Sequence, residues 1–153
     1  MSGVMIKMGI YGITRTLTHI HTELLSVGIL ILLVSAFSGI TGVVIAIVQH
    51  DYKRLLAYHS IENIGIIGIG IGIGVIGLAI GNPALASLGF AGGLLHILNH
   101  SLFKSLLFYS AGSIYQQTHT KNIEQLGGLM KKMPVTAVFF LIGAIAISGL
   151  PPF

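Results

Sequence analysis

Residues 24–48 read LLSVGILILLVSAFSGITGVVIAIV, a continuous apolar run without a single charged side chain. A helix that crosses the hydrocarbon core of a bilayer needs about 20 apolar residues, because the core is about 30 Å thick. This run is long enough to cross it. The stretch therefore predicts that lipid, and not water, surrounds at least this part of the chain.

Further apolar segments lie on both sides of this run, separated by short polar connections. They cover residues 1–14, 61–80, 84–115 and a stretch that begins after Met133-Pro134 and is interrupted at Gly149-Leu150-Pro151-Pro152. Only 8% of the residues are charged and 54% are hydrophobic, whereas a soluble domain carries about 25% charged residues. We therefore predict an all-α, polytopic transmembrane helix bundle of about five membrane segments, with residues 1–153 forming one transmembrane region.

The segment at residues 61–80 has the least obvious secondary structure. Gly68, Gly70, Gly72 and Gly74 alternate with isoleucines, a period that is typical of a β-strand. An isolated strand in lipid would leave its backbone groups unpaired, and the flanking segments are too long for the strands of a barrel. We predict a helix whose glycines let a neighbouring helix pack closely.

Lysine and arginine are distributed unevenly over the connections. The connections after the first and third segments hold only Arg15, and those after the second and fourth hold Lys53, Arg54, Lys121, Lys131 and Lys132. The positive-inside rule predicts that the second group faces the cytoplasm. We expect a multi-pass protein of the cytoplasmic (inner) membrane. Lys53 and Arg54 are expected to anchor the interface, and residues 118–132 to lie along the membrane surface.

Composition and motifs exclude several functional classes. The basic residues behind the net charge of +4 are scattered between apolar runs, so no nucleic-acid partner is expected. Cysteine is absent, which excludes disulfides and thiolate metal sites. The sequence contains no phosphate-binding loop, no H-E-x-x-H zinc motif and no G-x-S-x-G nucleophile elbow. We expect no self-contained enzyme, no redox active site and no bound cofactor or metal.

Lys7 is the first candidate functional residue, because it lies in the middle of a short apolar segment. A charged lysine near the bilayer centre costs about 2.5 to 3.5 kcal/mol, so such residues usually face a bundle interior or a wet cavity. A desolvated lysine can also release its proton near neutral pH, which suits a proton carrier. The alternative is a lysine that extends along the helix to the membrane interface.

His96, His100 and Lys104 recur every four residues within an apolar run. On a helix this spacing places one polar group on each turn, in a stripe about 12 Å long. Histidine titrates near neutral pH, so bridging water could relay protons along the stripe. Metal ligation by the two histidines, haem binding as in membrane cytochromes, and simple hydrogen-bonded packing remain alternatives. The lysine one turn beyond favours a relay, because a cation repels a metal ion.

Glu62 lies just inside the third apolar segment, with His59 three residues earlier on the same helical face. This spacing lets the two side chains pair. An acid at that depth is either half of a structural ion pair or an entry point for protons.

Four strings in this sequence resemble a known family. They are VMIKMGIYG at residues 4–12, HDYKRLLAYHSIENIG at 50–65, LHILNHSLFK at 95–104 and SGLPPF at 148–153. In order and spacing they are similar to the antiporter-like subunits of respiratory complex I, Mrp-type cation/proton antiporters and membrane-bound hydrogenases. The version HSIENIG is most similar to the large membrane subunit of formate-hydrogenlyase and hydrogenase-4 complexes.

The resemblance implies a bundle of about fourteen helices built from inverted repeats with broken helices. Lys7 then matches the central lysine of the eighth helix, Lys104 matches a lysine or histidine of the eleventh, and residues 149–153 match the break in the twelfth. We expect an internal fragment that spans helices eight to twelve. Its implied function is proton or Na⁺/H⁺ translocation, with other membrane subunits and a soluble hydrogenase or quinone-reductase arm as partners. The alternative is a non-pumping scaffold or an inert truncated product.

Overall fold

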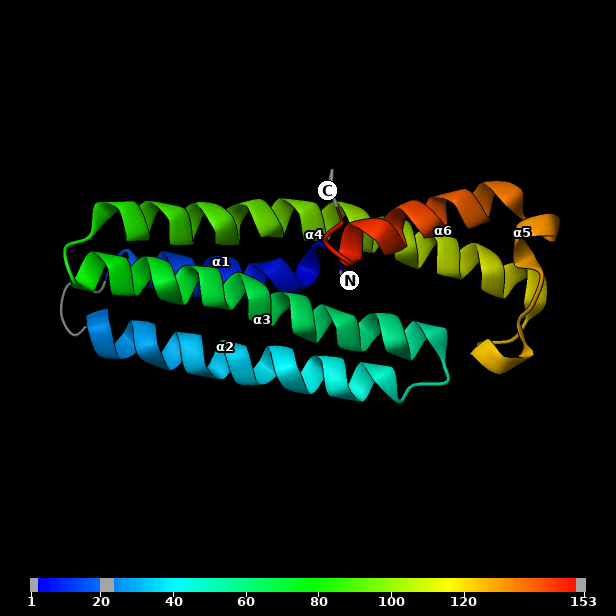
Figure 1. The fold of residues 1–153 in the computed structure, drawn as a ribbon, viewed down its shortest axis with the longest axis horizontal. Helices are drawn as coiled ribbons and strands as arrows, with labels where there is room; N and C mark the ends of the chain where they lie inside the picture. Colours follow the sequence, from blue (N-terminus) through cyan, green and yellow to red (C-terminus); the bar gives the residue numbers. More distant parts are fainter. Residues whose placement is uncertain (1–2, 20–23, 151–153) are drawn as a thin grey trace.

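The computed structural model describes residues 3–19 and 24–150, and in these ranges the chain folds into a helical bundle (Figure 1). Its helices are α1 (Met5–Leu17), α2 (Leu24–Ile47), α3 (Tyr52–Ala79), α4 (Pro83–Thr118), the 3₁₀-helix η1 (Ile123–Gln125), α5 (Leu129–Lys132) and α6 (Pro134–Ile147). The predicted all-α fold is confirmed. Residues 61–80, where glycine alternates with isoleucine, are helical up to Ala79, as predicted.

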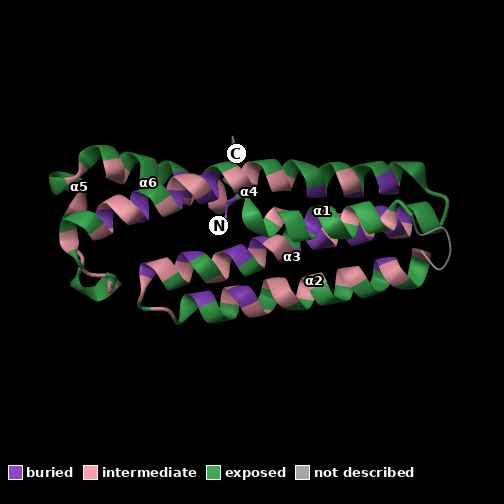
Figure 2. Ribbon diagram, turned by 180° about the vertical axis from the view of Figure 1, so that it is seen from behind, coloured by how far each residue is buried: buried purple, intermediate pink, exposed green. Residues whose placement is uncertain are grey.

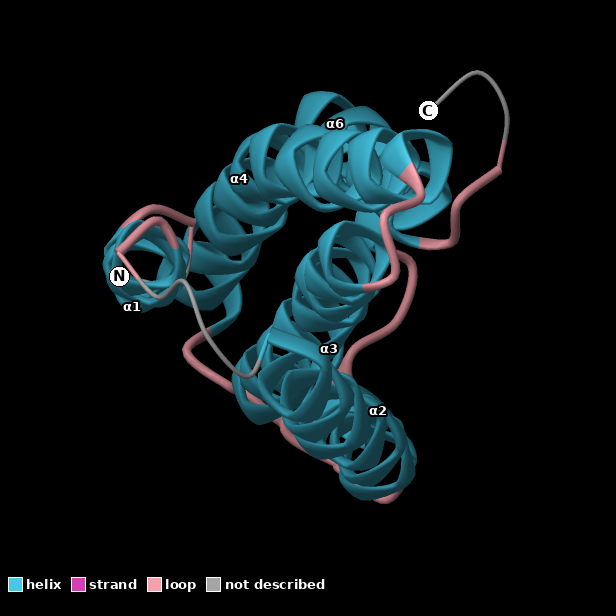
Figure 3. Ribbon diagram, turned by 90° about the vertical axis from the view of Figure 1, so that its left-hand side faces the viewer, coloured by secondary structure: helices cyan, strands magenta, loops and turns pink. Residues whose placement is uncertain are grey.

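α3 lies between α2 and α4, as the ribbon views from two sides show (Figures 1 and 3). α1 runs beside α4, and α6 packs against the C-terminal half of α4 (Figures 1 and 3). Buried positions are frequent along α3 and α4 and sparse on α2 (Figure 2). The helices that carry most of the predicted site residues are therefore also the best covered.

Glycines set how closely α3 approaches its two neighbours. A Cβ atom added to Gly65 would lie 2.6 Å from the backbone oxygen of Ser35 in α2. On the other side of α3, a Cβ on Gly70 would lie 2.8 Å from the Cα of Gly93 in α4. Such distances leave no room for a side chain, so the backbones themselves touch, as small residues permit between membrane helices.

The helix lengths differ from a uniform set of membrane spans. α2 and α3 are both long and apolar enough to cross a membrane. α4 has 36 residues, a length of about 54 Å, but the polar residues around His96 and His100 interrupt its apolar character. α6 has only 14 residues, about 21 Å, and it ends beside the middle of α4 (Figure 1).

The structure corrects several predicted boundaries. α3 begins at Tyr52 and not at Ile61, because Asp51 caps it: the carboxylate accepts the backbone N–H groups of Lys53 at 2.8 Å and Arg54 at 3.2 Å. Lys53 and Arg54 therefore lie in the first helical turn and not in a loop.

The first and last helices also differ from the predicted segments. α1 continues past Thr14 to Leu17 and includes Arg15. α6 ends at Ile147, just before Gly149 with its positive φ of 65°. The helix therefore ends where the glycine of the predicted break stands, and residues 151–153 of that break lie outside the described residues.

The two lysine-bearing connections meet at one end of the bundle. The backbone N–H of Tyr52 donates to Lys121 O at 3.2 Å, and that of Ile123 donates to His50 O at 2.9 Å. The connection between α3 and α4 lies at the opposite end (Figure 1). This arrangement agrees with the charge asymmetry on which the predicted orientation rests.

Candidate functional site

Lys104, in the stripe on α4, is an ionisable side chain with no exposed surface at all. Its Nζ donates a hydrogen bond of 2.6 Å to the backbone oxygen of Leu56 in α3. The Phe108 ring lies close to it, with its centroid 5.9 Å from Nζ, within the range of a cation–π contact. Among the described residues, no carboxylate forms a salt bridge with this amine.

His100 lies one helical turn before Lys104 and is also fully buried. Neither of its ring nitrogens has a hydrogen-bond partner among the described residues. Its ring stacks on that of His96, with centroids 6.3 Å apart and planes 8° from parallel, and meets the Phe103 ring edge-on at 5.3 Å. Buried polar atoms without a protein partner are uncommon, and ordered water usually satisfies them.

His96 connects α4 to a polar group on α3. Its Nε2 lies 2.9 Å from Oδ1 of Asn63, and Nδ2 of Asn63 donates to the backbone oxygen of His59 at 2.7 Å. On the same side of α3, Nδ1 of His59 lies 2.5 Å from a carboxylate oxygen of Glu62. The expected pairing of His59 with Glu62 is therefore present, and Asn63, which is bonded to the backbone of His59, joins α3 to the histidine stripe.

Lys7 is half-buried on α1, which lies beside α4 (Figure 3). One turn before it, Gly3 approaches the α4 backbone near Ser101. One turn after it, Ile10 packs in a cluster with Ile67 and Ile97. Lys7 thus lies along the part of α4 that carries the histidines, and the structure brings it to the same region of the bundle as Lys104.

A cavity of about 740 Å³ opens between α3, α4 and the end of α6. Its polar lining comes from Glu62, Asn63, His96, Asn99 and Ser148. The C-terminal end of a helix carries partial negative charge on its last carbonyl groups, and that end of α6 borders the cavity. The space is large enough for several water molecules, so water can reach both Glu62 and His96.

Comparison with known proteins identifies the family. The family described as NADH:quinone oxidoreductase/Mrp antiporter, TM matches residues 1–153. The chain belongs to this antiporter family. The predicted resemblance is therefore confirmed, and the chain belongs to a family of polytopic, antiporter-like membrane proteins.

Individual relatives within the antiporter family include two proteins of Escherichia coli strain K12. Formate hydrogenlyase subunit 3 is 47% identical over 151 residues, which cover 99% of this chain and 25% of that protein. Hydrogenase-4 component B is 44% identical over 155 residues, covering 99% of this chain and 23% of that protein. A Na(+)/H(+) antiporter subunit of Alkalihalophilus pseudofirmus is 35% identical, covering 98% of this chain and 28% of that protein. The chain thus spans about a quarter of the length of the two Escherichia coli relatives.

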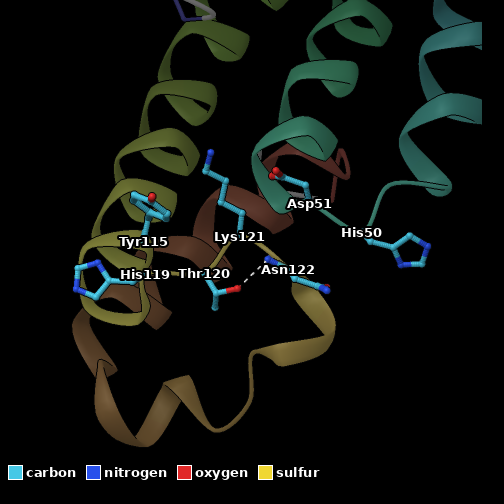
Figure 4. A pocket seen from close by; sticks show the side chains of 7 residues that line it. All are labelled: His50, Asp51, Tyr115, His119, Thr120, Lys121 and Asn122. Atoms are coloured by element: carbon cyan, nitrogen blue, oxygen red, sulfur yellow. Dashed lines mark hydrogen bonds between the residues drawn. The ribbon is translucent and has the colours of Figure 1, made fainter.

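The predicted interface anchors lie at the lysine-rich end of this antiporter-family bundle. Nζ of Lys53 stands 4.1 Å from the centroid of the Tyr115 ring, and Nζ of Lys121 stands 5.5 Å from it. Arg54 is exposed. A pocket of about 460 Å³ lies here, and its wall consists of His50, Asp51, Tyr115, His119, Thr120, Lys121 and Asn122 (Figure 4). None of the residues that line this pocket belongs to the stripe of His96, His100 and Lys104, so the pocket and the buried polar row are separate features.

Two elements of the site were not among the residues predicted from sequence. Asn63 follows Glu62 directly and stands four residues after His59. This spacing, which places Asn63 on the same helical face as His59, is the sequence signal that could have identified it. The acceptor of Lys104 is a backbone oxygen, which no side-chain pattern reveals. The described residues contain no group of three or more His, Asp or Glu side chains placed to hold a metal ion.

Proposed function

We propose that the full-length protein moves protons across the membrane, or exchanges Na⁺ for protons, as a subunit of a redox-driven complex. Membership of the antiporter family and the name of the Na(+)/H(+) antiporter relative support this proposal. The proposed path runs through Lys7, Lys104, His96, His100, Glu62 and His59.

The observation that carries the proposal is the placement of Lys104. An amine with no exposed surface and no salt bridge to a described carboxylate is costly to keep charged. Its backbone acceptor can bond the ammonium and the neutral amine alike and carries no full negative charge that would fix the proton, so a nearby change of charge can shift it. A structural lysine would more often carry a fixed counter-charge.

The remaining residues of the proposed path exchange protons with Lys104 or influence its charge. A proton that leaves Nζ of Lys104 passes through water to His100, whose ring nitrogens have no described hydrogen-bond partner. It then moves to His96 at the next turn, and from there through the 740 Å³ cavity toward Glu62 and its partner His59. Lys7 approaches the same row from α1, and its charge state alters the field on the histidines. Moving one charge against 100 mV requires about 2.3 kcal/mol, which a redox reaction can supply.

The proposed partners follow from the two Escherichia coli relatives, whose names describe components of a hydrogenase and a formate hydrogenlyase. We propose other membrane subunits and a soluble hydrogenase or quinone-reductase arm, in the cytoplasmic membrane, with Lys53, Arg54 and Lys121 toward the cytoplasm. A mild-detergent pull-down with an antibody to residues 121–132 tests this. Co-purifying redox subunits would support the proposal, and a lone product of 16.2 kDa would instead favour an inert scaffold.

The transport function is tested in everted vesicles that carry the full-length protein within its complex. We expect Lys104→Ala and Lys7→Ala each to reduce redox-driven acidification by about a hundredfold, the size typical of a lost acid–base group. Lys131→Ala, at an exposed position in α5, is the control and should retain normal acidification. Unchanged acidification in the Lys104 and Lys7 variants would show that the proposed relay role is wrong.

A further inference from the structure

Asn63 is a buried amide, only 2% exposed, and it joins the two helices of the site. The backbone oxygen of His59 can only accept a hydrogen bond, so the side-chain atom 2.7 Å from it must be the NH₂ group. The orientation of the amide is therefore determined by chemistry. Its carbonyl oxygen Oδ1 necessarily faces His96.

An amide oxygen is an acceptor and never a donor. The atom of His96 that lies 2.9 Å from it is Nε2, so Nε2 must carry a hydrogen for the contact to be a hydrogen bond. In a neutral imidazole only one nitrogen is protonated, and the partner of one nitrogen decides the state of the other. His96 next to Asn63 is thus held with Nε2 protonated and Nδ1 free to accept.

We propose that Asn63 is a positioning residue that fixes His96 as the Nε2–H tautomer, so that protons enter and leave this histidine at Nδ1. The tautomer assignment stands on the hydrogen bonds alone, whereas its importance for transport rests on the proposed function.

A second consequence concerns the path between His96 and the His59–Glu62 pair. The amide of Asn63 bonds the backbone oxygen of His59 with one end and Nε2 of His96 with the other, and neither of these bonds involves the paired side chains of His59 and Glu62. An amide has no proton that it exchanges near neutral pH, so it cannot pass one on. Protons that move between Glu62 and His96 therefore pass through the cavity that both residues line, and not through the amide of Asn63.

The tautomer is measured by solid-state NMR of the full-length protein in lipid vesicles, with ¹⁵N-labelled histidine. The His96 signals are assigned by their disappearance in His96→Gln. In the unaltered protein we expect the neutral ring to be protonated at Nε2. Asn63→Leu removes the acceptor, and we expect the ratio of Nε2–H to Nδ1–H forms to fall roughly fivefold, the bias that one buried hydrogen bond exerts.

Three further variants sharpen the measurement. Asn63→Asp keeps an acceptor oxygen and should keep Nε2 protonated. Asn63→Ala replaces the leucine variant if leucine does not fold at this buried position. Asn99→Leu is the matched control, because Asn99 lines the same cavity yet makes no hydrogen bond to His96 among the described residues. An unchanged tautomer ratio in both Asn63→Leu and Asn63→Ala, or an equal change in Asn99→Leu, would overturn the inference.

Acidification by the same vesicles separates this inference from the proposed function. If the tautomer ratio changes and transport falls severalfold, both are supported. If the ratio changes while transport is normal, the inference about Asn63 stands and the relay role of His96 is wrong. If transport falls while the ratio is constant, Asn63 acts in another way and the inference is wrong.

Discussion

The two halves of α3 make different kinds of contact with α4. In residues 65–77 the contact is backbone against backbone, because Gly70 and Gly74 of α3 meet Gly89 and Gly93 of α4. In residues 52–63 it is made by side chains, including Asn63 with His96. The glycine half of α3 therefore meets α4 without polar side chains, and the other half meets α4 through the buried polar residues of the site.

The difference teaches how a buried polar row is kept in place. Lys104 reaches Leu56 O and His96 reaches Asn63 only if α3 and α4 keep their antiparallel register. Polar contacts of this kind contribute little net stability, since each ion or dipole must first be desolvated. The close glycine contacts gain dispersion energy over many atoms. We infer that the glycine half supplies the stability and that the polar half uses the register it provides.

The largest expected effect on stability comes from filling the glycine contact. A Cβ at Gly89 would lie 2.8 Å from the Cα of Gly74, whereas one at Gly92 would meet nothing within 4 Å. Gly89→Ala should lower the free energy of unfolding by about 2 kcal/mol through overpacking. Gly92→Ala should raise it by about 0.5 to 1 kcal/mol, because alanine favours a helix. Unfolding in mixed detergent–SDS micelles, followed by circular dichroism, measures both. Equal effects of the two substitutions would refute the proposed division between the halves.

A smaller effect, of the opposite sign, is expected in the polar half. Lys104→Met replaces the buried amine by an apolar side chain of similar length, and Leu56 O keeps its bond from Ser60 Oγ at 3.2 Å. We expect the free energy of unfolding to rise by about 1 kcal/mol, as often happens when buried charges are replaced. The exposed control Lys131→Met should stay within about 0.5 kcal/mol of the original protein. A loss of more than about 2 kcal/mol in Lys104→Met would mean that this lysine is chiefly structural.

The sequence alone predicts the features that depend on a single helix. Helix formation in residues 65–77 follows from the cost of an unpaired strand in lipid, and the row of His96, His100 and Lys104 follows from four-residue spacing. The start of α3 is harder to predict, because the charges of Lys53 and Arg54 resemble those of a loop. Asp51 is the signal that marks it, since its side chain caps the first turn.

Features that join two helices were not predictable in the same way. Asn63 and His96 are 33 residues apart, and nothing in the spacing of either segment relates them. Their meeting depends on the register between α3 and α4, which close glycine contacts determine. The bond from Lys104 to Leu56 O has a backbone acceptor, so no residue type could have indicated it.

The smallest expected effect concerns the end of α3 where neither glycines nor buried histidines lie. Nζ of Lys53 is 4.1 Å from the Tyr115 ring centroid, and a cation–π contact at a partly exposed site contributes about 0.5 to 1 kcal/mol. A double-mutant cycle of Lys53→Met and Tyr115→Leu should give a coupling energy of that size. The matched cycle with Tyr109→Leu, whose side chain is 80% exposed, should give none. A coupling near zero in the first cycle would mean that this contact does not help to set the register between α3 and α4, which then depends on the glycine contacts. A coupling above about 2 kcal/mol would mean that the N-terminal turn of α3 also helps to set that register.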